Sequence, residues 1–538
     1  MKRILPILVV MLVALTSSNL QAQQLDKTNQ TNNEHRHGAW CGSLLSAEQL
    51  ARHEAFVEEY YHRGGKERYQ ANGRATKYVP ISYHIVSKSN RTGGRSIKDA
   101  LNDLCVLQQD MLHADIQFYL KPNANKGNVM IQLIPNDGWL NGSVGANTGQ
   151  FTLMTSLNND HTAVNLYQVK TIRGTSGLLG IATGAGNSFF NGGAISTATN
   201  AIFVKNGEGD KDHTLAHEFG HHFSLPHTFY GWEGDAATTS DYVCGANAPA
   251  DKSKYDGSNC TTAGDRLCDT DPDYIRQGFQ CSGTVTLHTC QQVDANGGTG
   301  FAEGANVMSY GFGCVNKSFS TDQINTMDAH LTTHLSSFIA NTPSLDVIAG
   351  TSALNPADAT LYDAVVLDWS AATNATHYGI EVSLVSNFSA SAIIETAVVG
   401  GTSYTATSLQ PNRKYYWRVI PFNETDFCAT TSATSDFTTS NNATSTRTIT
   451  SVNNVSLRPN FTTSGQSVNL IVDAIESFEA DINVYNVQGQ LVSQAVQTAF
   501  QVGNNVHQIN TSGFTSGVYF VTMQTETGII NKKLVVTK

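Results

Sequence analysis

The feature that most constrains this chain is the stretch from His217 to His227, which reads H-E-F-G-H-H-F-S-L-P-H. On a helix, residues four apart share a face, so His217 and His221 can place two imidazoles on one metal ion. Pro226 ends such a helix, and the chain can then bring His227 back as a third ligand. Three histidine ligands with an open fourth position are typical of a catalytic zinc site rather than a closed structural one.

Two side chains beside these ligands have different expected roles. Glu218 adjoins the first ligand and can reach a water bound to the metal, which predicts a role as catalytic base. His222 lies about 100° round the helix from His221, so we do not expect it to bind the metal. The alternative interpretation is an amphipathic core helix with incidental histidines, but the third histidine at the required spacing favours the metal site.

The composition and the first residues indicate the compartment in which the protein works. The net charge is −11 and only 14% of residues are charged, which argues against nucleic acid or an anionic membrane as the main partner. Lys2 and Arg3 precede an apolar run from Ile4 to Leu15, which predicts a signal peptide over residues 1–22. No segment is long enough for a comfortable transmembrane span, so we expect an exported protein.

Residues 23–75 are interpreted as a propeptide, because they lie between the signal peptide and the first strand of a compact domain. Cys41 and Gly42 come just before its helical part. A thiolate binds zinc well, so Cys41 can fill the open fourth position and hold the protein latent. The alternatives are a disulfide from Cys41 to Cys105, or a free thiol. Arg74 is one candidate for the cleavage site that removes the propeptide.

Residues 76–340 have the pattern of an α/β (α+β) domain, with alternating strands and a helix before the histidine motif. The part after His227 is rich in loops and cysteines. Its cysteines are spaced without paired C-x-x-C knuckles, which favours disulfides over a second metal site. The disulfide candidates are Cys244, Cys260, Cys268, Cys281, Cys290 and Cys314.

Two further stretches carry candidate site residues. The carboxylates between Gly264 and Asp273 can bind calcium as a structural ion, and a solvated acidic turn is the alternative. Met308 lies in a predicted tight turn and can form an apolar floor under the imidazoles. Tyr310, two residues later, can donate a hydrogen bond to an oxyanion.

Taken together, His217 to His227, Met308 to Tyr310, Gly264 to Thr270 and the helix from Phe319 resemble the pappalysin (ulilysin-like) family of metzincin zinc peptidases. The resemblance implies a metzincin fold, endopeptidase activity on proteins or peptides, and calcium sites. It also makes Cys41-Gly42 similar to a cysteine-switch element. One departure is Ser224, because metzincins usually have glycine there, which permits a sharp turn with positive φ.

The C-terminal part is predicted to hold two all-β sandwich domains. Residues 345–440 resemble a fibronectin type III domain, which we interpret as a spacer in preference to a substrate- or carbohydrate-binding module. Residues 450–538 resemble the sorting domain of type IX secretion, with an adhesion domain as the alternative. The resemblance implies the type IX machinery as a partner, and a protein secreted to the exterior or the cell surface of a Gram-negative bacterium.

The sequence therefore predicts a multidomain, secreted zinc endopeptidase that hydrolyses peptide bonds through a zinc-bound water activated by Glu218. The competing prediction is a surface binding protein on the same scaffold with weak or lost activity, for which Ser224 and the β-rich tail are the reasons. A retained Glu218 and a propeptide favour the enzyme, because a protein without catalysis needs no latency.

Overall fold

The structure is a computed structural model of the 538-residue chain. The predicted signal peptide, Gly42 and Cys281 lie outside the described residues. The described residues are 41, 45, 47–72, 74–123, 129–141, 148–172, 178–182, 200–209, 211, 213–232, 243–274, 279–280, 290–314, 317–339, 341–428, 432–441, 449, 451–525 and 528–538. Within them no helix combines the length and the apolar character that crossing a membrane requires.

A mixed sheet organises the α/β region. Its order is β2-β1-β4-β6-β5, and β3 also pairs with β1. All neighbours are parallel except β5, which runs antiparallel to β6 and forms one edge. The strands are β1 (Lys77–Ser87), β2 (Ile116–Leu120), β3 (Ile131–Pro135), β4 (Val164–Val169), β5 (Gly180–Ala182) and β6 (Ala201–Lys205). The mixed sheet agrees with the α/β pattern expected of residues 76–340.

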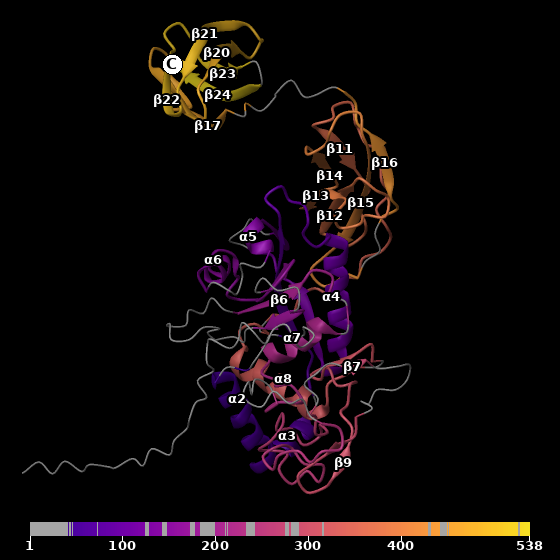
Figure 1. Ribbon diagram of the computed structural model, residues 1–538. Helices are drawn as coiled ribbons and strands as arrows, with labels where there is room; N and C mark the ends of the chain where they lie inside the picture. Colours follow the sequence, from indigo (N-terminus) through magenta and orange to yellow (C-terminus); the bar gives the residue numbers. More distant parts are fainter. Residues whose placement is uncertain are drawn as a thin grey trace, which may run out of the picture.

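Helices cover this sheet, and Figure 1 shows α4 and α7 beside it. Ser96 caps α4 by accepting a hydrogen bond from the Asp99 amide. Phe219 of α7 packs against Phe118 of β2, with ring centroids 4.7 Å apart. The helices are α4 (Ile97–Met111), η2 (Leu112–Ala114), α5 (Asp137–Leu140), α6 (Thr148–Asn158) and α7 (Thr214–His222).

The described residues between α7 and α8 (Thr321–His334) lie mostly in turns and loops, as the composition predicted. Short strand pairs interrupt these loops: β7 (Phe279–Gln280) with β10 (Gly311–Phe312), and β8 (Gln292–Val293) with β9 (Thr299–Gly300). Disulfides join Cys244 to Cys290 and Cys260 to Cys268, and Cys314 is also disulfide-bonded. These bonds confirm the disulfide interpretation for the described members of the cluster. Ser320 caps α8 with a complete capping box.

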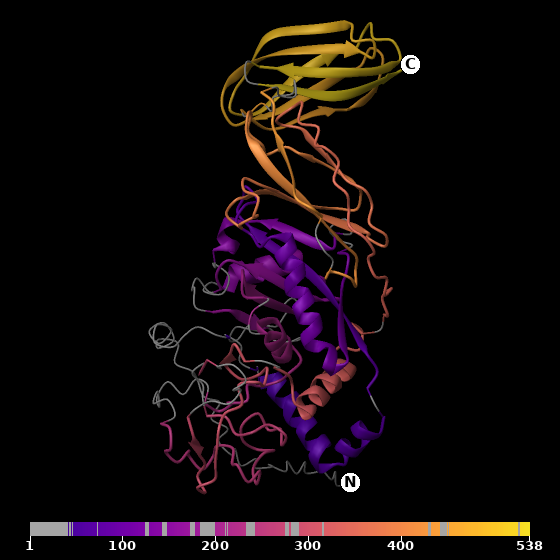
Figure 2. The same cartoon turned by 90° about the vertical axis from the view of Figure 1, so that its right-hand side faces the viewer.

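The N-terminal segment, residues 47–72, folds as α2 (Ala47–Val57), η1 (Glu58–His62) and α3 (Gly65–Asn72). Figures 1 and 2 place α2 and α3 beside α8, at the end of the α/β region away from the β domains. The Gln49 amide donates to the backbone oxygen of His221 at 3.0 Å, which joins α2 to the end of α7. The predicted propeptide is thus docked on the domain that carries the histidine motif.

The first β domain, residues 345–440, is a sandwich whose two sheets are ordered β11-β14 and β13-β12-β15-β16. Trp369 is buried in its core. The strands are β11 (Val365–Asp368), β12 (His377–Ser383), β13 (Ile393–Val399), β14 (Ser403–Ala406), β15 (Lys414–Phe422) and β16 (Ser435–Thr438). This fibronectin-like domain lies between the α/β region and the last domain in both views.

The fibronectin-like domain is joined to the α/β region by a disulfide between Cys105 of α4 and Cys428. The proposed alternative of a Cys41–Cys105 disulfide is therefore wrong, because Cys105 already has Cys428 as its partner. Gly379 of β12 allows a close approach, since a Cβ atom there would lie 2.5 Å from Ile97. The fibronectin-like domain therefore packs closely against α4.

The C-terminal domain is a second sandwich, with sheets ordered β17-β19-β22 and β18-β24-β23-β20-β21. Its core draws on residues from Ile449 to Val536. The strands are β17 (Val452–Arg458), β18 (Phe461–Thr463), β19 (Ser467–Ala474), β20 (Phe478–Asn486), β21 (Leu491–Phe500), β22 (Gly503–Asn510), β23 (Gly517–Gln524) and β24 (Ile529–Thr537).

Candidate metal centre and active site

The three histidines of the motif meet at one point. The Nε2 atoms of His217 and His221 lie 3.1 Å apart, those of His217 and His227 lie 3.2 Å apart, and those of His221 and His227 lie 3.0 Å apart. Tetrahedral zinc ligands about 2.05 Å from the metal would lie about 3.3 Å from one another. The side-chain triangle therefore fits zinc.

The opposite ring nitrogens fix how the ligands are protonated. The Nδ1 of His217 lies 2.7 Å from the Val307 carbonyl oxygen, and the Nδ1 of His221 lies 2.7 Å from that of Leu225. A carbonyl can only accept, so both Nδ1 atoms carry the proton and the Nε2 lone pairs point at the common centre. Burial, and then the neighbouring His221 and His227, hold the pKa of His217 well below its usual range. Burial lowers the pKa of His227 to about 3.

The turn that brings His227 back contains the predicted departure at Ser224. Its φ is 74°, in the left-handed region where glycine is favoured. The Ser224 hydroxyl is buried and lies 2.9 Å from Nδ1 of His330 on α8. The Leu225 amide donates to Gly220 at 2.9 Å and closes the helix end. The serine thus adopts the backbone conformation of the usual glycine, with a hydrogen-bonding neighbour for its hydroxyl.

Cys41 reaches the same centre from the N-terminal side. Its Sγ and the ligand nitrogens of the three histidines all lie within 4.8 Å of one another. Cys41 remains a thiol, and its backbone forms a parallel bridge with Gly180 at the start of edge strand β5. The structure therefore places the Cys41 thiol among the candidate ligands of the predicted metal site.

Glu218 is fully buried beside this centre. A Cβ atom at Gly180 would lie 2.3 Å from its Oε1 atom, so any side chain at position 180 would displace the carboxylate. Sequence reasoning missed this requirement, because a glycine in a glycine-rich stretch gives no sign of its partner. The edge of the sheet thereby fixes where the Glu218 carboxylate lies.

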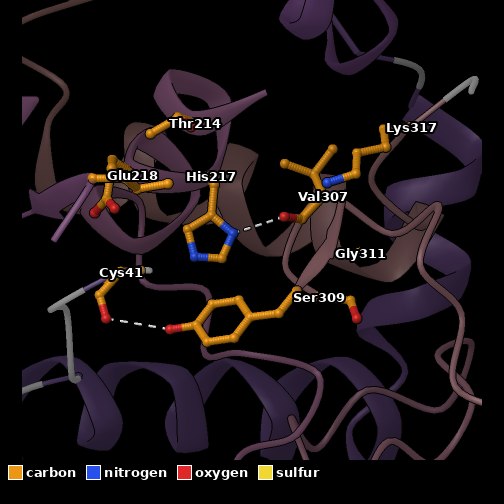
Figure 3. A pocket seen from close by; sticks show the side chains of 10 residues that line it. Cys41, Thr214, His217, Glu218, Val307, Ser309, Gly311 and Lys317 are labelled. Carbon is orange, nitrogen blue, oxygen red and sulfur yellow. Dashed lines mark hydrogen bonds between the residues drawn. The ribbon is translucent and has the colours of Figure 1, made fainter. Parts of the chain in front are cut away.

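Met308 and Tyr310 both lie at the site as predicted. Met308 is fully buried, and its Sδ would lie 2.5 Å from a Cβ atom at Gly220, so the helix and the methionine turn can touch only through glycine. The ring of Tyr310 lies 5.0 Å from that of His227, measured between centroids. The Tyr310 hydroxyl donates to the Cys41 carbonyl oxygen at 3.2 Å, drawn as a dashed line in Figure 3.

A buried carboxylate that the sequence did not single out for this role ties the motif to the methionine turn. Asp273 accepts hydrogen bonds from the Thr228 hydroxyl at 2.7 Å and the Ser309 hydroxyl at 3.0 Å. Thr228 follows the third histidine, and Ser309 follows Met308. Asp273 therefore holds the two loops together below the ligands.

Two other carboxylates of the predicted calcium stretch, those of Asp265 and Asp269, also have protein partners. Asp265 accepts from the Thr270 hydroxyl at 2.7 Å, and burial raises its pKa to about 7. Asp269 accepts from the Ser320 hydroxyl at 2.7 Å and from the Asp322 amide at 2.8 Å, at the start of α8. Among the described residues, the clustered metal-ligating group is the one formed by Cys41 and the three histidines. Calcium binding stays a prediction.

His222 lies apart from the ligand triangle, as its position on the helix predicted. It is fully buried, with its ring edge-on to Phe223 at 5.5 Å between centroids. It also faces His330 closely enough to lower the pKa of that residue, after burial as the main cause. We therefore assign His222 to the packing between α7 and α8.

A pocket beside His217 and Glu218 encloses about 340 Å³ of empty space when the open solvent at its entrance is included. Figure 3 draws its lining, with Cys41 and Glu218 on one side of His217 and Lys317 on the other. The far wall includes Val307, Tyr310 and Gly311, which flank Met308 in the sequence.

Comparisons with known proteins identify the C-terminal domain. Residues 459–537 match the family model described as the secretion system C-terminal sorting domain. This match indicates a protein secreted to the exterior or the cell surface by the type IX route, with the secretion machinery as a partner. No curated protein matches the chain.

Solved structures match short parts of the chain, with scores too low to carry an argument. The fibronectin domain FN3tt mut is 21% identical over 18% of this chain and 97% of its own, with a TM-score of 0.14. The fn3 domain of human collagen alpha-1(XX) is 21% identical over 20% and 98%, with a TM-score of 0.15. The chain covers 14% of a Paenibacillus cycloisomaltooligosaccharide glucanotransferase, at 11% identity over 16% of this chain and a TM-score of 0.14.

Proposed function

We propose that this chain is a zinc endopeptidase of the metzincin type, similar to the pappalysin family, which is exported as a latent proenzyme and cleaves extracellular proteins or peptides. The observation that carries the proposal is the convergence of the Nε2 atoms of His217, His221 and His227, 3.0–3.2 Å apart, beside the buried Glu218 carboxylate. The buried Met308 under α7 supports the metzincin assignment.

Each residue has a distinct chemical task in this proposal. A zinc ion held by the three histidines would polarise a peptide carbonyl and lower the pKa of a water molecule. Glu218 accepts the proton from the attacking water and delivers it to the leaving amine nitrogen. Tyr310 donates its hydroxyl hydrogen to the carbonyl oxygen as negative charge develops there. Strand β5 lies at the edge of the sheet, where an extended peptide can be added as a further strand.

The same arrangement supports latency. The Cys41 thiol lies where a fourth ligand would bind, and the Cys41 carbonyl accepts the Tyr310 hydroxyl. The Cys41 backbone also pairs with Gly180 at the edge of the sheet. The N-terminal segment therefore supplies a candidate fourth ligand, and it also engages the oxyanion donor and part of the peptide-binding edge.

The test uses the full-length chain with Cys41→Ala, because the fibronectin-like domain shares a core and a disulfide with the α/β region. The protein is incubated with a denatured protein substrate, with and without a zinc chelator, and new termini are mapped by mass spectrometry. We expect chelator-sensitive cleavage. Adding Glu218→Ala should lower the rate by about 10³-fold while zinc stays bound in a metal analysis.

A zinc-loaded, folded Cys41→Ala chain that cleaves nothing would contradict the enzyme proposal. That result would favour the binding protein with lost activity, for which the positive φ of Ser224 is the structural reason. Cleavage that persists undiminished with Glu218→Ala would retain the enzyme but remove Glu218 from its role.

A further inference from the structure

The turn that follows α7 positions two of the three candidate ligands. Its Leu225 carbonyl oxygen lies 2.7 Å from Nδ1 of His221 and so orients that ring. Two residues later, the same turn brings His227 to the other two ligands. A change in the backbone of this turn therefore moves both imidazoles relative to the third. That third ligand, His217, is held instead by the Val307 carbonyl oxygen.

The centre of this turn is Ser224, which has a φ of 74°. A residue with a Cβ atom adopts this left-handed conformation only at a cost in conformational energy, whereas glycine adopts it freely. The flanking residues restrict the turn, because Phe223 and Leu225 are fully buried in the main core. The conformation of Ser224 is therefore unfavourable by itself and yet fixed by its surroundings.

The Ser224 side chain interacts with α8. Ser224 is only 1% exposed, and its hydroxyl lies 2.9 Å from Nδ1 of His330. Burial, followed by nearby histidines and Arg52, holds the pKa of His330 well below its usual range, so the ring is neutral. A neutral imidazole has one nitrogen that donates and one that accepts, and a serine hydroxyl can pair with either. The helix that carries His330 is anchored in the main core by Met327 and Leu331.

We propose that the Ser224 hydroxyl and the His330 ring form a positioning pair, which holds the ligand turn in the conformation that glycine adopts without a partner. The hydrogen bond between them stabilises position 224 in the left-handed region, and that conformation places the Leu225 carbonyl oxygen and His227. The inference rests on the zinc site of the proposed function and assigns two further residues to it. Neither side chain belongs to the ligand set, so their effect should appear in zinc affinity.

Two substitutions at position 224 separate the hydroxyl from the backbone conformation. Ser224→Ala keeps a Cβ atom in the left-handed region but removes the hydrogen bond, so zinc should bind about tenfold more weakly. Ser224→Gly also removes the hydroxyl, but glycine adopts the conformation unaided, so zinc affinity should stay within about threefold of the parent. A serine that merely filled space would predict the larger loss for glycine, because glycine is the smaller residue.

The measurements use the full-length chain with Cys41→Ala, so that the three histidines alone hold the ion. Zinc affinity is determined by competition with a chelator of known affinity. Cobalt(II) in place of zinc reports the ligand geometry through its visible absorption, which Ser224→Ala should alter and Ser224→Gly should leave as in the parent. Thr326→Val is the control, because it removes a buried hydroxyl of α8 that donates to the Asp322 carbonyl oxygen. It should change neither readout.

The partner side chain is tested with and without glycine at the turn. His330→Leu should weaken zinc binding as much as Ser224→Ala does, and the two changes together should add little to either alone. In the Ser224→Gly background, His330→Leu should leave zinc affinity within about threefold, because glycine needs no partner. His330→Asn, whose amide can occupy the place of Nδ1, should recover most of the affinity that His330→Leu loses.

Three results decide between this pair and its alternatives. Zinc affinity unchanged by Ser224→Ala, or weakened equally by Ser224→Ala and Ser224→Gly, would overturn the pair. A loss from His330→Leu that persists in the Ser224→Gly background would also overturn it, because His330 would then act only through the stability of α8. If no variant cleaves a peptide but zinc affinity follows Ser224 and His330, the peptidase proposal fails and the positioning pair stands.

Discussion

The N-terminal segment and the fibronectin-like domain both lie against the α/β region, but different interactions hold them. The N-terminal segment contributes Val57 to the main core, with Phe56 and Tyr61 at its margin. Hydrogen bonds and ion pairs also connect it to the domain. They include Gln49 to His221, His53 to Asp265, Glu54 to Arg266, and Tyr60, Tyr61 and Lys66 to Asp322.

The fibronectin-like domain is attached by apolar burial and a covalent bond. Ile420, Phe422 and Phe427 belong to the main core of the α/β region, together with residues of α4. Glu381 is fully buried, and it accepts a hydrogen bond from the Lys98 amide of α4 at 3.2 Å. The Cys105–Cys428 disulfide links the domain to the same helix.

This difference indicates which attachment is reversible. A hydrogen bond between protein groups contributes only about 1 kcal/mol net, because water replaces it when the surfaces part. Buried apolar surface gives about 25 cal/mol for each Å², and a disulfide persists until it is reduced. We therefore expect the N-terminal segment to dissociate from the α/β region, whereas the fibronectin-like domain is a permanent part of the same folded unit. A freely moving spacer does not fit that interface.

The largest expected effect tests whether the N-terminal segment acts through its thiol. Cys41→Ala should raise the peptidase activity of the uncleaved chain on the order of a hundredfold, because a metal ligand is lost and the latent population falls. Activity on a quenched peptide measures this. Gln49→Ala, which removes a contact of α2 but keeps the thiol, should leave the chain latent. A Cys41→Ala chain as latent as the parent would refute the thiol's role.

The next prediction addresses the permanent attachment. The pair Cys105→Ala and Cys428→Ala should lower the free energy of unfolding of the joined α/β and fibronectin-like unit by about 3–4 kcal/mol, since the disulfide closes a very long loop. Calorimetry of the full-length chain measures it. The control pair is Cys260→Ala and Cys268→Ala, whose sequence separation is 8 and whose loss should cost less. If thermal unfolding were unchanged in the variant that lacks Cys105 and Cys428, apolar contact alone would hold the domain and the disulfide would contribute nothing.

The pH dependence of docking gives a third test, at His53. Its Nε2 lies 2.7 Å from the Asp265 carbonyl oxygen, and burial lowers its pKa from 6.5 to about 4. In the released segment the His53 imidazole takes up a proton below pH 6.5, whereas in the docked segment it does so only near pH 4. Docking should thus weaken as pH falls through that window, by up to about 3 kcal/mol. Hydrogen exchange of residues 47–72 at pH 7 and pH 5 measures this.

A matched variant separates His53 from its charged neighbours Glu54, Arg266 and Asp265. The pKa of Asp265 is raised to about 7, chiefly by burial, so its contribution has the opposite sign and favours docking at low pH. His53→Gln keeps a hydrogen-bond donor but does not titrate. The parent should lose more protection between pH 7 and pH 5 than His53→Gln does, and equal losses would remove His53 from the pH response.

Local spacing made much of the site predictable. The positions of His217, His221 and His227 encode a shared helix face followed by a turn, and Met308 lies under them as expected. The strand and helix patterns of the α/β region also predicted most of its elements, because period and composition are local properties. The match over residues 459–537 confirms the sorting domain in the same way.

What could not be predicted depends on contacts between distant residues. Cys105 and Cys428 are separated by 323 positions, and nothing near either cysteine names its partner. Gly180 is required because Glu218 fills the space of its missing side chain, a fact visible only once β5 lies along α7. The place of Lys317 in the cavity lining likewise depends on how the segment after the methionine turn folds. Sequence patterns indicate which face of a helix or strand is buried and where the chain turns, but they do not indicate which elements pack against each other.

The smallest expected effect concerns a single hydroxyl in the reversible attachment. The Tyr61 hydroxyl donates to Asp322 and accepts from the Cys268 amide, the latter at 2.7 Å. Tyr61→Phe leaves that amide without its acceptor and should weaken docking of residues 47–72 by about 1–2 kcal/mol, read as faster hydrogen exchange in the segment. Tyr69→Phe, in the same segment with its ring against Tyr60, should change exchange far less. If Tyr61→Phe instead lowered the melting temperature of the joined α/β and fibronectin-like unit as much as it loosened the segment, the two attachments would not be independent.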